Sequence, residues 1–271
     1  MQASDGLRFG FGSNWLRFSE LIDDGRIAEA EAGLQRLFGS ERLEGLSLLD
    51  IGSGSGLSSL AARRLGARVV SFDYDADSVA CTARLRDHQL PGDDGWRIER
   101  GSILDPTYVE SLGKFDIVYS WGVLHHTGAM PEALSLASRL VGPAGLLAFA
   151  LYRKTRLCSL WRLEKRWYVG ASLQAQFRAR RCYEAAMRLA FGLKGRDFQS
   201  YVAKYQGNRG MSYQHDVHDW MGGYPYESIT PAAVAALMGA LDFDPVRSFT
   251  RPYSNGLFGS GCDEYVYRRV P

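Results

Sequence analysis

The sequence predicts an α/β protein: a doubly wound, seven-stranded and mostly parallel sheet with an inserted helical cap. Two observations predict this fold. Between residues 46 and 152, short apolar runs alternate with segments of helical periodicity, which is the pattern of βαβ units. A glycine-rich turn, GSGSG at residues 52–56, directly follows the first apolar run, and two further strand-like runs close the chain.

The expected elements follow one another in a regular order as far as residue 152. Residues 15–38 have apolar positions at helical spacing, interrupted near residues 24–25, which predicts two short helices. Five strands are then expected at 46–51, 67–72, 96–100, 115–120 and 146–152. Helices are expected between them at 57–65, at 76–89, after Pro106 and from Pro131 to residue 140.

The alternation stops after residue 152, which divides the chain into three parts. Residues 153–228 have helical patterns and aromatic clusters but no clear strand. Thr230 and Pro231 then begin a helix to about residue 241, before strands at 245–249 and 263–268. We expect N-terminal helices over the site (1–44), a Rossmann-like domain (45–152 and 229–271) and a basic, aromatic cap (153–228) that covers the ligand-binding edge of the sheet.

The composition is that of an ordinary globular protein: 271 residues, 46% hydrophobic and 23% charged. The four cysteines are far apart and form no CxxC pair, which argues against a zinc ribbon or a disulfide scaffold and favours a reducing compartment. The N-terminus has no signal-peptide pattern, and no apolar run approaches the roughly 20 residues of a membrane span. We expect a cytoplasmic protein without a membrane span.

The glycine-rich turn limits which ligand the first βα unit can bind. Glycine lets the chain turn sharply and lets a ligand approach the backbone closely. A Walker A loop is excluded because Gly56 is followed by Leu57 rather than by lysine. The third glycine also comes one residue early for the dinucleotide-binding pattern GxGxxG, so no diphosphate site is convincingly encoded.

The end of the second strand points to a nucleoside instead. Asp73 could accept hydrogen bonds from both hydroxyls of a ribose, and Tyr74 beside it could supply an apolar face for adenine. Nucleoside binding without selection for phosphate is the chemistry of S-adenosylmethionine.

Several motifs together make the sequence resemble the class I S-adenosylmethionine-dependent methyltransferase superfamily. LLDIGSGSG (48–56) resembles its first motif, GSILD (101–105) stands in the loop that usually contacts adenine, and FDIVYSWGVLHHTG (115–128) resembles its fourth motif. YSWGVLHHTG, DWMGGYPYE and GCDEYVY also resemble a bacterial group similar to ubiquinone-type O-methyltransferases. The resemblance implies the strand order 3-2-1-4-5-7-6 and S-adenosyl-L-methionine as the cofactor.

The resemblance also implies which residues bind the cofactor. Many relatives have an acid where Ser102 stands, so the adenine contact here could use the backbone alone. The implied cofactor-binding residues are Asp50, Gly52, Ser53, Gly54, Gly56, Asp73, Tyr74, Ser102, Ile103, Ser120 and Trp121.

Methyl transfer needs an acceptor atom in line with the methyl group and often a nearby base. His125 and His126 follow the fourth strand, where such a base could lie; alternatively, one imidazole only anchors the loop. At the end of the insertion, a polar cluster could supply acid–base chemistry through His215 and Asp216, contact the substrate, or be a solvated part of the cap. Its members are Tyr213, His215, Asp216, His218 and Asp219. His215 and His218 are three residues apart, but spacing fixes no third ligand, so we expect no metal.

Three further residues are candidates for closing the acceptor site. Tyr224 lies in GGYPYE, a turn-forming stretch that could be a gate over the acceptor or merely a connection back into the domain. Asn14 and Trp15 could close over the cofactor from the N-terminal helices, or Trp15 could simply pack in a core.

One segment is strongly basic: residues 151–210 hold 14 of the 32 basic residues and 3 of the 30 acidic ones. These charges could hold an anionic substrate, touch an acidic membrane surface or partner, or bind nucleic acid. Their interleaving with aromatics at helical spacing is more typical of amphipathic helices with solvated basic faces. No RNA-binding module pattern is present, so a nucleic-acid partner is disfavoured.

We therefore expect methyl transfer to a small molecule, which could be anionic, at oxygen rather than nitrogen. An enzyme of the same fold could instead transfer or cyclise the aminocarboxypropyl chain of the cofactor and release methylthioadenosine. A binding module could also have kept the fold without catalysis, although the joint presence of Asp50, Gly52, Gly54 and Asp73 argues against it. The acceptor and the oligomeric state stay open.

Overall fold

A seven-stranded sheet runs through the computed structural model, which describes residues 7–12, 15, 22–209, 213–252 and 254–271. Its strand order, β3-β2-β1-β4-β5-β7-β6, confirms the expected one. Only β7 runs antiparallel to its neighbours β5 and β6. The strands are β1 (Ser47–Ile51), β2 (Arg68–Asp73), β3 (Trp96–Arg100), β4 (Phe115–Trp121), β5 (Val141–Tyr152), β6 (Phe243–Phe249) and β7 (Cys262–Arg269).

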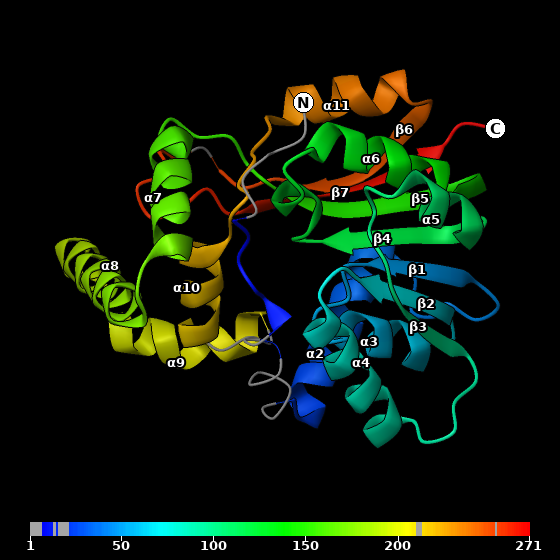
Figure 1. Ribbon diagram of the computed structural model, residues 1–271, viewed down its shortest axis with the longest axis horizontal. Helices are drawn as coiled ribbons and strands as arrows, with labels where there is room; N and C mark the ends of the chain where they lie inside the picture. The colour runs from blue at the N-terminus through cyan, green and yellow to red at the C-terminus, as the bar shows by residue number, and fades with distance from the viewer. Residues whose placement is uncertain (1–6, 13–14, 16–21, 210–212, 253) are drawn as a thin grey trace.

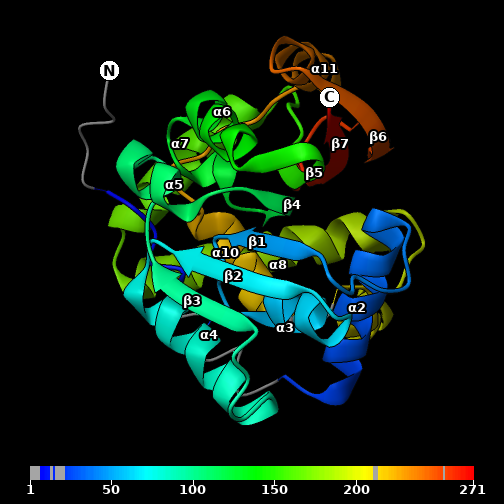
Figure 2. The ribbon, with the colours of Figure 1, turned by 90° about the vertical axis from the view of Figure 1, so that its right-hand side faces the viewer.

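Helices cover both faces of the sheet (Figures 1 and 2). One face is covered by α2 (Asp24–Phe38), α3 (Leu57–Arg64) and α4 (Ala76–Gln89), and the other by α5 (Pro106–Leu112), α6 (Met130–Arg139) and α11 (Pro231–Ala240). Successive side chains of the central strands enter opposite cores: Leu48 packs with the first group and Leu49 with the second. This two-sided burial explains why the strands read as continuous apolar runs.

One boundary agrees with the sequence-based expectation, and one differs from it. The interruption near residues 24–25 is the start of α2, because the Asp23 carboxylate accepts a hydrogen bond from the Arg26 amide at 2.9 Å and so caps the helix. Strand β5 begins at Val141, five residues earlier than expected. Val141 pairs with Phe115 and Leu146 pairs with Ile117, so residues 142–145 form an irregularity at which the register shifts between these two pairs.

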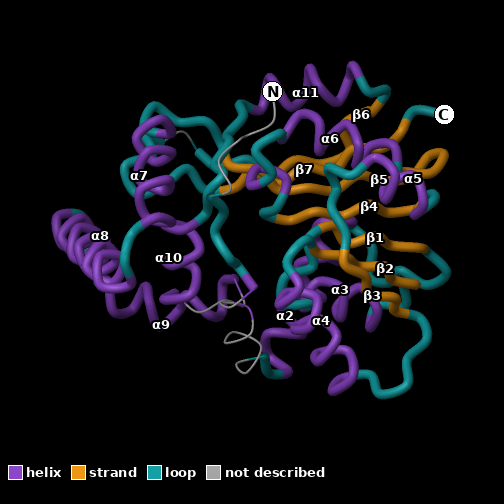
Figure 3. Tube along the Cα trace, in the orientation of Figure 1, coloured by secondary structure: helices purple, strands orange, loops and turns teal. Residues whose placement is uncertain are grey.

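The segment between β5 and α11 is helical, as Figure 3 shows, and lies beyond the carboxyl ends of the parallel strands. Aromatic side chains form its own core, with Tyr168, Phe198 and Tyr213 buried together. None of the helices in the described ranges is both long and apolar enough to cross a membrane. The helices of this cap are α7 (Cys158–Gly170), α8 (Leu173–Leu193), α9 (Phe198–Arg209) and α10 (Tyr213–Gly222).

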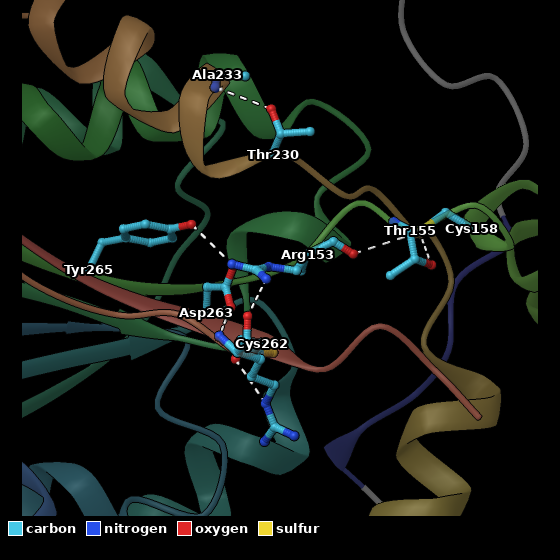
Figure 4. Close-up of polar contacts among 9 residues, drawn as sticks. Arg153, Thr155, Cys158, Thr230, Ala233, Cys262, Asp263 and Tyr265 are labelled. Carbon is cyan, nitrogen blue, oxygen red and sulfur yellow. Dashed lines mark hydrogen bonds and ion pairs between the residues drawn. The ribbon is translucent and has the colours of Figure 1, made fainter. Parts of the chain in front are cut away.

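A buried ion pair fixes the point where the chain leaves the sheet for the cap (Figure 4). Arg153, directly after β5, donates from Nε to Oδ2 of Asp263 in β7 at 2.7 Å. The other carboxylate oxygen of Asp263 accepts the Arg251 amide at 2.8 Å, and the Tyr265 hydroxyl donates to Oδ2 at 3.3 Å. Arg153 also bridges to Ile229, so both ends of the cap segment meet here.

We predict that Asp263→Ala lowers the free energy of unfolding by about 3 kcal/mol or more, because it leaves the partly buried Arg153 guanidinium without its carboxylate. Urea unfolding followed by circular dichroism measures this change. Asp244→Ala, at an exposed carboxylate of β6, is the control and should change stability by no more than about 0.5 kcal/mol. Equal effects of both variants would contradict the assignment of Asp263 as an anchor.

Candidate functional site

A large cavity lies where the parallel strands end and the cap begins. Its volume is about 2460 Å³, more than twice the roughly 300–1,000 Å³ typical of small-molecule pockets. Its walls come from the turns after β1, β2, β3 and β4, from α8, α9 and α10, and from N-terminal residues between Arg8 and Trp15. There is room for two ligands side by side.

The turn after β1 offers its backbone to this cavity. Gly52, Gly54 and Gly56 have φ angles of +79°, +55° and +81°, which favour glycine. A Cβ on Gly52 would lie 2.5 Å from the Val123 side chain, and one on Gly54 would lie 3.1 Å from the indole of Trp15. Gly52 and Gly54 line the cavity, whereas Gly56 precedes the first turn of α3 as its N-cap.

Asp73 ties this turn to the end of β2. Its carboxylate accepts the Gly54 amide at 3.0 Å and the Asp75 amide at 2.9 Å. Burial raises the pKa of Asp73, while these two amides oppose the rise. The carboxylate therefore lines the cavity in a fixed orientation.

Asp50 and Ser53 support the same turn. Asp50 is 2% exposed and accepts the Ser59 hydroxyl at 2.6 Å. Burial raises the pKa of Asp50 to about 7. Ser53 donates its amide to the Phe72 carbonyl at 3.1 Å, and its hydroxyl lies 3.0 Å from that of Thr82. Both residues line the cavity.

The loops after β2 and β3 form one side wall. Tyr74 is 59% exposed, and its ring centroid lies 5.5 Å from the guanidinium carbon of Arg8. Ser102 accepts the Leu104 amide on its hydroxyl at 3.2 Å, and the Ile103 side chain is buried. Three residues that were expected to bind the cofactor, Tyr74, Ser102 and Ile103, line the cavity here.

Two neighbours at the end of β4 are placed differently. Trp121 lines the cavity and donates from its indole to Glu264 of β7 at 3.0 Å. Arg36 of α2 holds the other Glu264 oxygen at 2.6 Å. Ser120 is fully buried, does not line the cavity and donates its hydroxyl to the Ile51 carbonyl at 3.1 Å. Ser120 thus joins β4 to β1.

The two histidines after β4 also separate. His126 lines the cavity, and its Nδ1 lies 2.8 Å from the Pro225 carbonyl oxygen, which can only accept. Nδ1 therefore carries the proton in the neutral ring, and Nε2 keeps a lone pair. Burial lowers the pKa of His126 to about 4, so the ring is neutral at physiological pH.

His125 faces the interior instead. It is fully buried and does not line the cavity. Its Nδ1 accepts the Tyr152 amide at 3.4 Å, and its ring centroid lies 3.9 Å from that of Tyr152. Burial and the nearby charge of Lys165 hold the pKa of His125 well below its usual range. These contacts fit a loop anchor better than a base.

The described N-terminal residues 7–12 and 15 cross the mouth of the cavity, and we call them the strap. Arg8 donates to the Thr127 carbonyl at 2.7 Å, and the Phe9 amide donates to the Tyr224 carbonyl at 3.1 Å. The Gly12 amide donates to the Asp75 carboxylate at 3.1 Å, and Trp15 packs on Gly54. The strap joins the cap to the glycine turn. Asn14 lies outside the described residues.

The cap contributes Tyr213, Asp216 and Tyr224 to the cavity wall. Asp216 accepts a hydrogen bond from the Tyr205 hydroxyl, which ties α10 to α9. His215 does not line the cavity. Within the described ranges, no group of three or more histidine, cysteine, aspartate or glutamate residues could hold a metal ion.

Several lining residues were not expected from the sequence. Tyr152 ends β5, so the rule that ligands bind at the carboxyl ends of strands could have identified it. Trp220 lies beside the predicted polar cluster, and its ring centroid is 5.2 Å from that of Tyr152. Glu264 lies in the last strand, within the motif GCDEYVY, but that motif gave no indication of a role for this residue.

Comparison with known proteins identifies relatives of this arrangement. A family model described as a methyltransferase domain matches residues 22–192. Ubiquinone biosynthesis O-methyltransferases are similar over part of the chain: 32% identity over 118 residues in Caulobacter sp. strain K31 and 33% over 113 residues in Brucella ovis. These matches cover 43% and 42% of this chain and 45% and 44% of the relatives, so less than half of each relative is spanned.

Solved structures share the fold at low sequence identity. Magnesium protoporphyrin IX methyltransferase from Synechocystis PCC 6803, solved with bound SAH, has a TM-score of 0.54 at 15% identity and covers 91% of this chain and 84% of its own. The 1,6-didemethyltoxoflavin-N1-methyltransferase of Burkholderia thailandensis has a TM-score of 0.50 at 16% identity, over 92% of this chain and 80% of its own.

We predict that His126 keeps its neutral form from pH 8 down to about pH 5 and titrates near pH 4. Since an unfolded histidine titrates near pH 6.5, the unfolded chain binds the proton first, and this residue's contribution to stability falls as the pH drops from about 6.5 toward 4. Proton NMR of the ring, assigned with His126→Gln, measures the midpoint. A midpoint near 6.5 would contradict the buried, hydrogen-bonded placement.

Proposed function

The chain belongs to the methyltransferase domain family, and on that premise we propose that it transfers the methyl group of S-adenosyl-L-methionine to an oxygen atom of a small molecule. The observation that carries this proposal is the joint placement of the glycine turn, Asp73 and His126 in one cavity. Oxygen is favoured over nitrogen by the likeness to ubiquinone biosynthesis O-methyltransferases over 43% of the chain.

The residues at the sheet edge fit this cofactor. Gly54 permits close approach of a ligand to the backbone, the Asp73 carboxylate is held by two amides to accept ribose hydroxyls, and Tyr74 with Ile103 supplies apolar sides for adenine. Asp50 also lines the cavity, and a positively charged ligand beside it would favour its ionised form over the neutral form that burial favours. When bound, S-adenosyl-L-methionine would supply an electrophilic methyl carbon on a positively charged sulfur, and attack by an acceptor oxygen would form a C–O bond while the C–S bond breaks and S-adenosylhomocysteine leaves.

His126 is the proposed base on the acceptor side. Its Nε2 lone pair can take the proton of an acceptor hydroxyl, because Nδ1 is engaged with the Pro225 carbonyl. The low pKa of His126 keeps it in this accepting form. Tyr213, Asp216 and Tyr224 are proposed to contact the acceptor from the cap, since they line the same cavity.

The strap is proposed to exclude water from the two ligands. It touches both the glycine turn, through Trp15, and the cap, through Phe9. Exclusion of water strengthens electrostatic interactions in the site and prevents competing hydrolysis. Lys194 and Arg196 also line the cavity, and their charges favour an acceptor that carries a negative group.

We predict that Asp73→Ala weakens binding of S-adenosyl-L-methionine by at least about tenfold, because hydrogen bonds to a charged group contribute about 1.5–3 kcal/mol each. Isothermal titration calorimetry measures the affinity, and circular dichroism checks the fold. Asp94→Ala, at an exposed carboxylate before β3, is the control and should bind normally. Unchanged affinity in Asp73→Ala would exclude the ribose assignment.

We predict that His126→Gln lowers turnover by about 10²-fold or more while cofactor affinity changes little, because the variant lacks a proton acceptor at Nε2. His215→Gln should have a much smaller effect, since His215 does not line the cavity. Turnover is measured as S-adenosylhomocysteine formed with a small-molecule extract of the host. If His215→Gln lowered turnover more than His126→Gln does, the base would instead lie on α10.

Mass spectrometry of the same reaction mixtures tests which reaction takes place. S-adenosylhomocysteine that forms only when the extract is present supports methyl transfer, and the acceptor can be traced by its added methyl group. Methylthioadenosine that forms above the non-enzymatic background would overturn the proposal in favour of chemistry on the aminocarboxypropyl chain.

A further inference from the structure

The outer faces of α7 and α8 expose large apolar side chains. Leu160, Leu163 and Trp167 are spaced three and four residues apart, so they share one face of α7. Leu173 and Phe177 are four apart on the first turns of α8. All five are between 53% and 82% exposed. We call these five residues the α7–α8 face.

The cap does not need these side chains for its own packing. Its core uses other residues of the same helices, with Tyr168 of α7 buried and Tyr183 and Met187 of α8 packed against that core. Figure 1 shows α7 and α8 on the side of the molecule away from β6 and the C-terminus. Sequence alone favoured solvated basic helix faces, but five exposed apolar residues in two helices are more than scattered surface hydrophobics.

The exposed charged residues of the stretch that carries the α7–α8 face are all positive. The stretch 153–181 is fully described, and its sole acidic residue, Glu164, is half-buried. Its exposed basic residues are Lys154, Arg156, Arg162, Arg166, Arg178 and Arg181.

We propose that the α7–α8 face docks on the surface of a bilayer that contains anionic lipids. Leucine, tryptophan and phenylalanine can enter the boundary between headgroups and acyl chains, while arginines beside them pair with lipid phosphates. Tyr183 and Met187 of α8 line the cavity, so the same helix contributes to the α7–α8 face in its first turns and to the cavity wall further along. This inference does not depend on methyl transfer.

Two other occupants fit the observations less well. A second copy of the chain, packed face to face, would bring two sets of these six cations together with no exposed carboxylate from this stretch to pair with them. A nucleic acid would match the charge, but its phosphates offer nothing to the three exposed leucines, since such interfaces are mostly polar and charged.

The test is co-sedimentation of the full chain with vesicles of phosphatidylcholine alone or with one quarter phosphatidylglycerol. We expect binding to the anionic vesicles to be at least tenfold stronger and to fall when sodium chloride is raised from about 50 to 500 mM. Leu163→Glu/Trp167→Glu and Arg178→Glu/Arg181→Glu should each reduce binding about tenfold. Val270→Glu, at an exposed apolar residue of the C-terminus, should bind as the wild type does.

Vesicles whose lipids have brominated acyl chains test whether Trp167 contacts the bilayer. They should quench part of the tryptophan emission of the wild type and markedly less in Trp167→Phe, which keeps an aromatic ring at the face. Failure to bind anionic vesicles, or equal binding by all variants, would overturn the proposal. If light scattering shows a dimer that is lost in Leu163→Glu/Trp167→Glu, the proposal is overturned in favour of self-association. If the protein binds a DNA duplex more tightly than it binds the vesicles, the proposal is overturned in favour of nucleic-acid binding.

Discussion

The parallel pairing of β1 with both β2 and β4 is the constraint on which the site depends. Parallel neighbours end at the same edge of a sheet, so the turns that follow them meet there. The hydrogen bond from the Gly54 amide to the Asp73 carboxylate is the direct result, since it joins the ends of two adjacent strands across 19 residues of sequence. The strap and the cap are added onto this edge and enclose the cavity.

Burial explains the electrostatics of the cavity. It raises the pKa of Asp50 to about 7 and lowers that of His126 to about 4, because a low-dielectric environment disfavours the charged form of either group. The low pKa leaves Nε2 of His126 unprotonated but also makes the ring a weaker base than a free imidazole, and a positively charged ligand in the cavity would favour the ionised form of Asp50. The pKa of Asp73 is raised for the same reason, but two amide donors favour its charged form and so oppose the rise.

The cap meets three different physical demands with one run of helices. At its root, the ion pair between Arg153 and Asp263 joins it to the sheet. On its inner side, tyrosines form a core, and several of them also line the cavity. On its outer side, apolar and basic residues stay exposed. The basic, aromatic composition of this segment does not distinguish these three surfaces from one another. Composition alone therefore favoured only helices with solvated basic faces.

The sequence by itself determined the strands, the helices between them and the glycine turn, because strand and helix periods and the need for positive φ at Gly52 and Gly54 are local properties. The strand order was implied by the resemblance of the motifs to a known superfamily, and the structure confirms it. Only the tertiary structure separated His125 from His126: the two are adjacent in sequence, and a carbonyl 99 residues away, at Pro225, fixes the second ring at the cavity. The same holds for Ser120, Trp220 and Glu264, whose positions follow from long-range packing. Motifs encode the backbone that binds a ligand, whereas the walls around it are set by which distant side chains fold against that backbone.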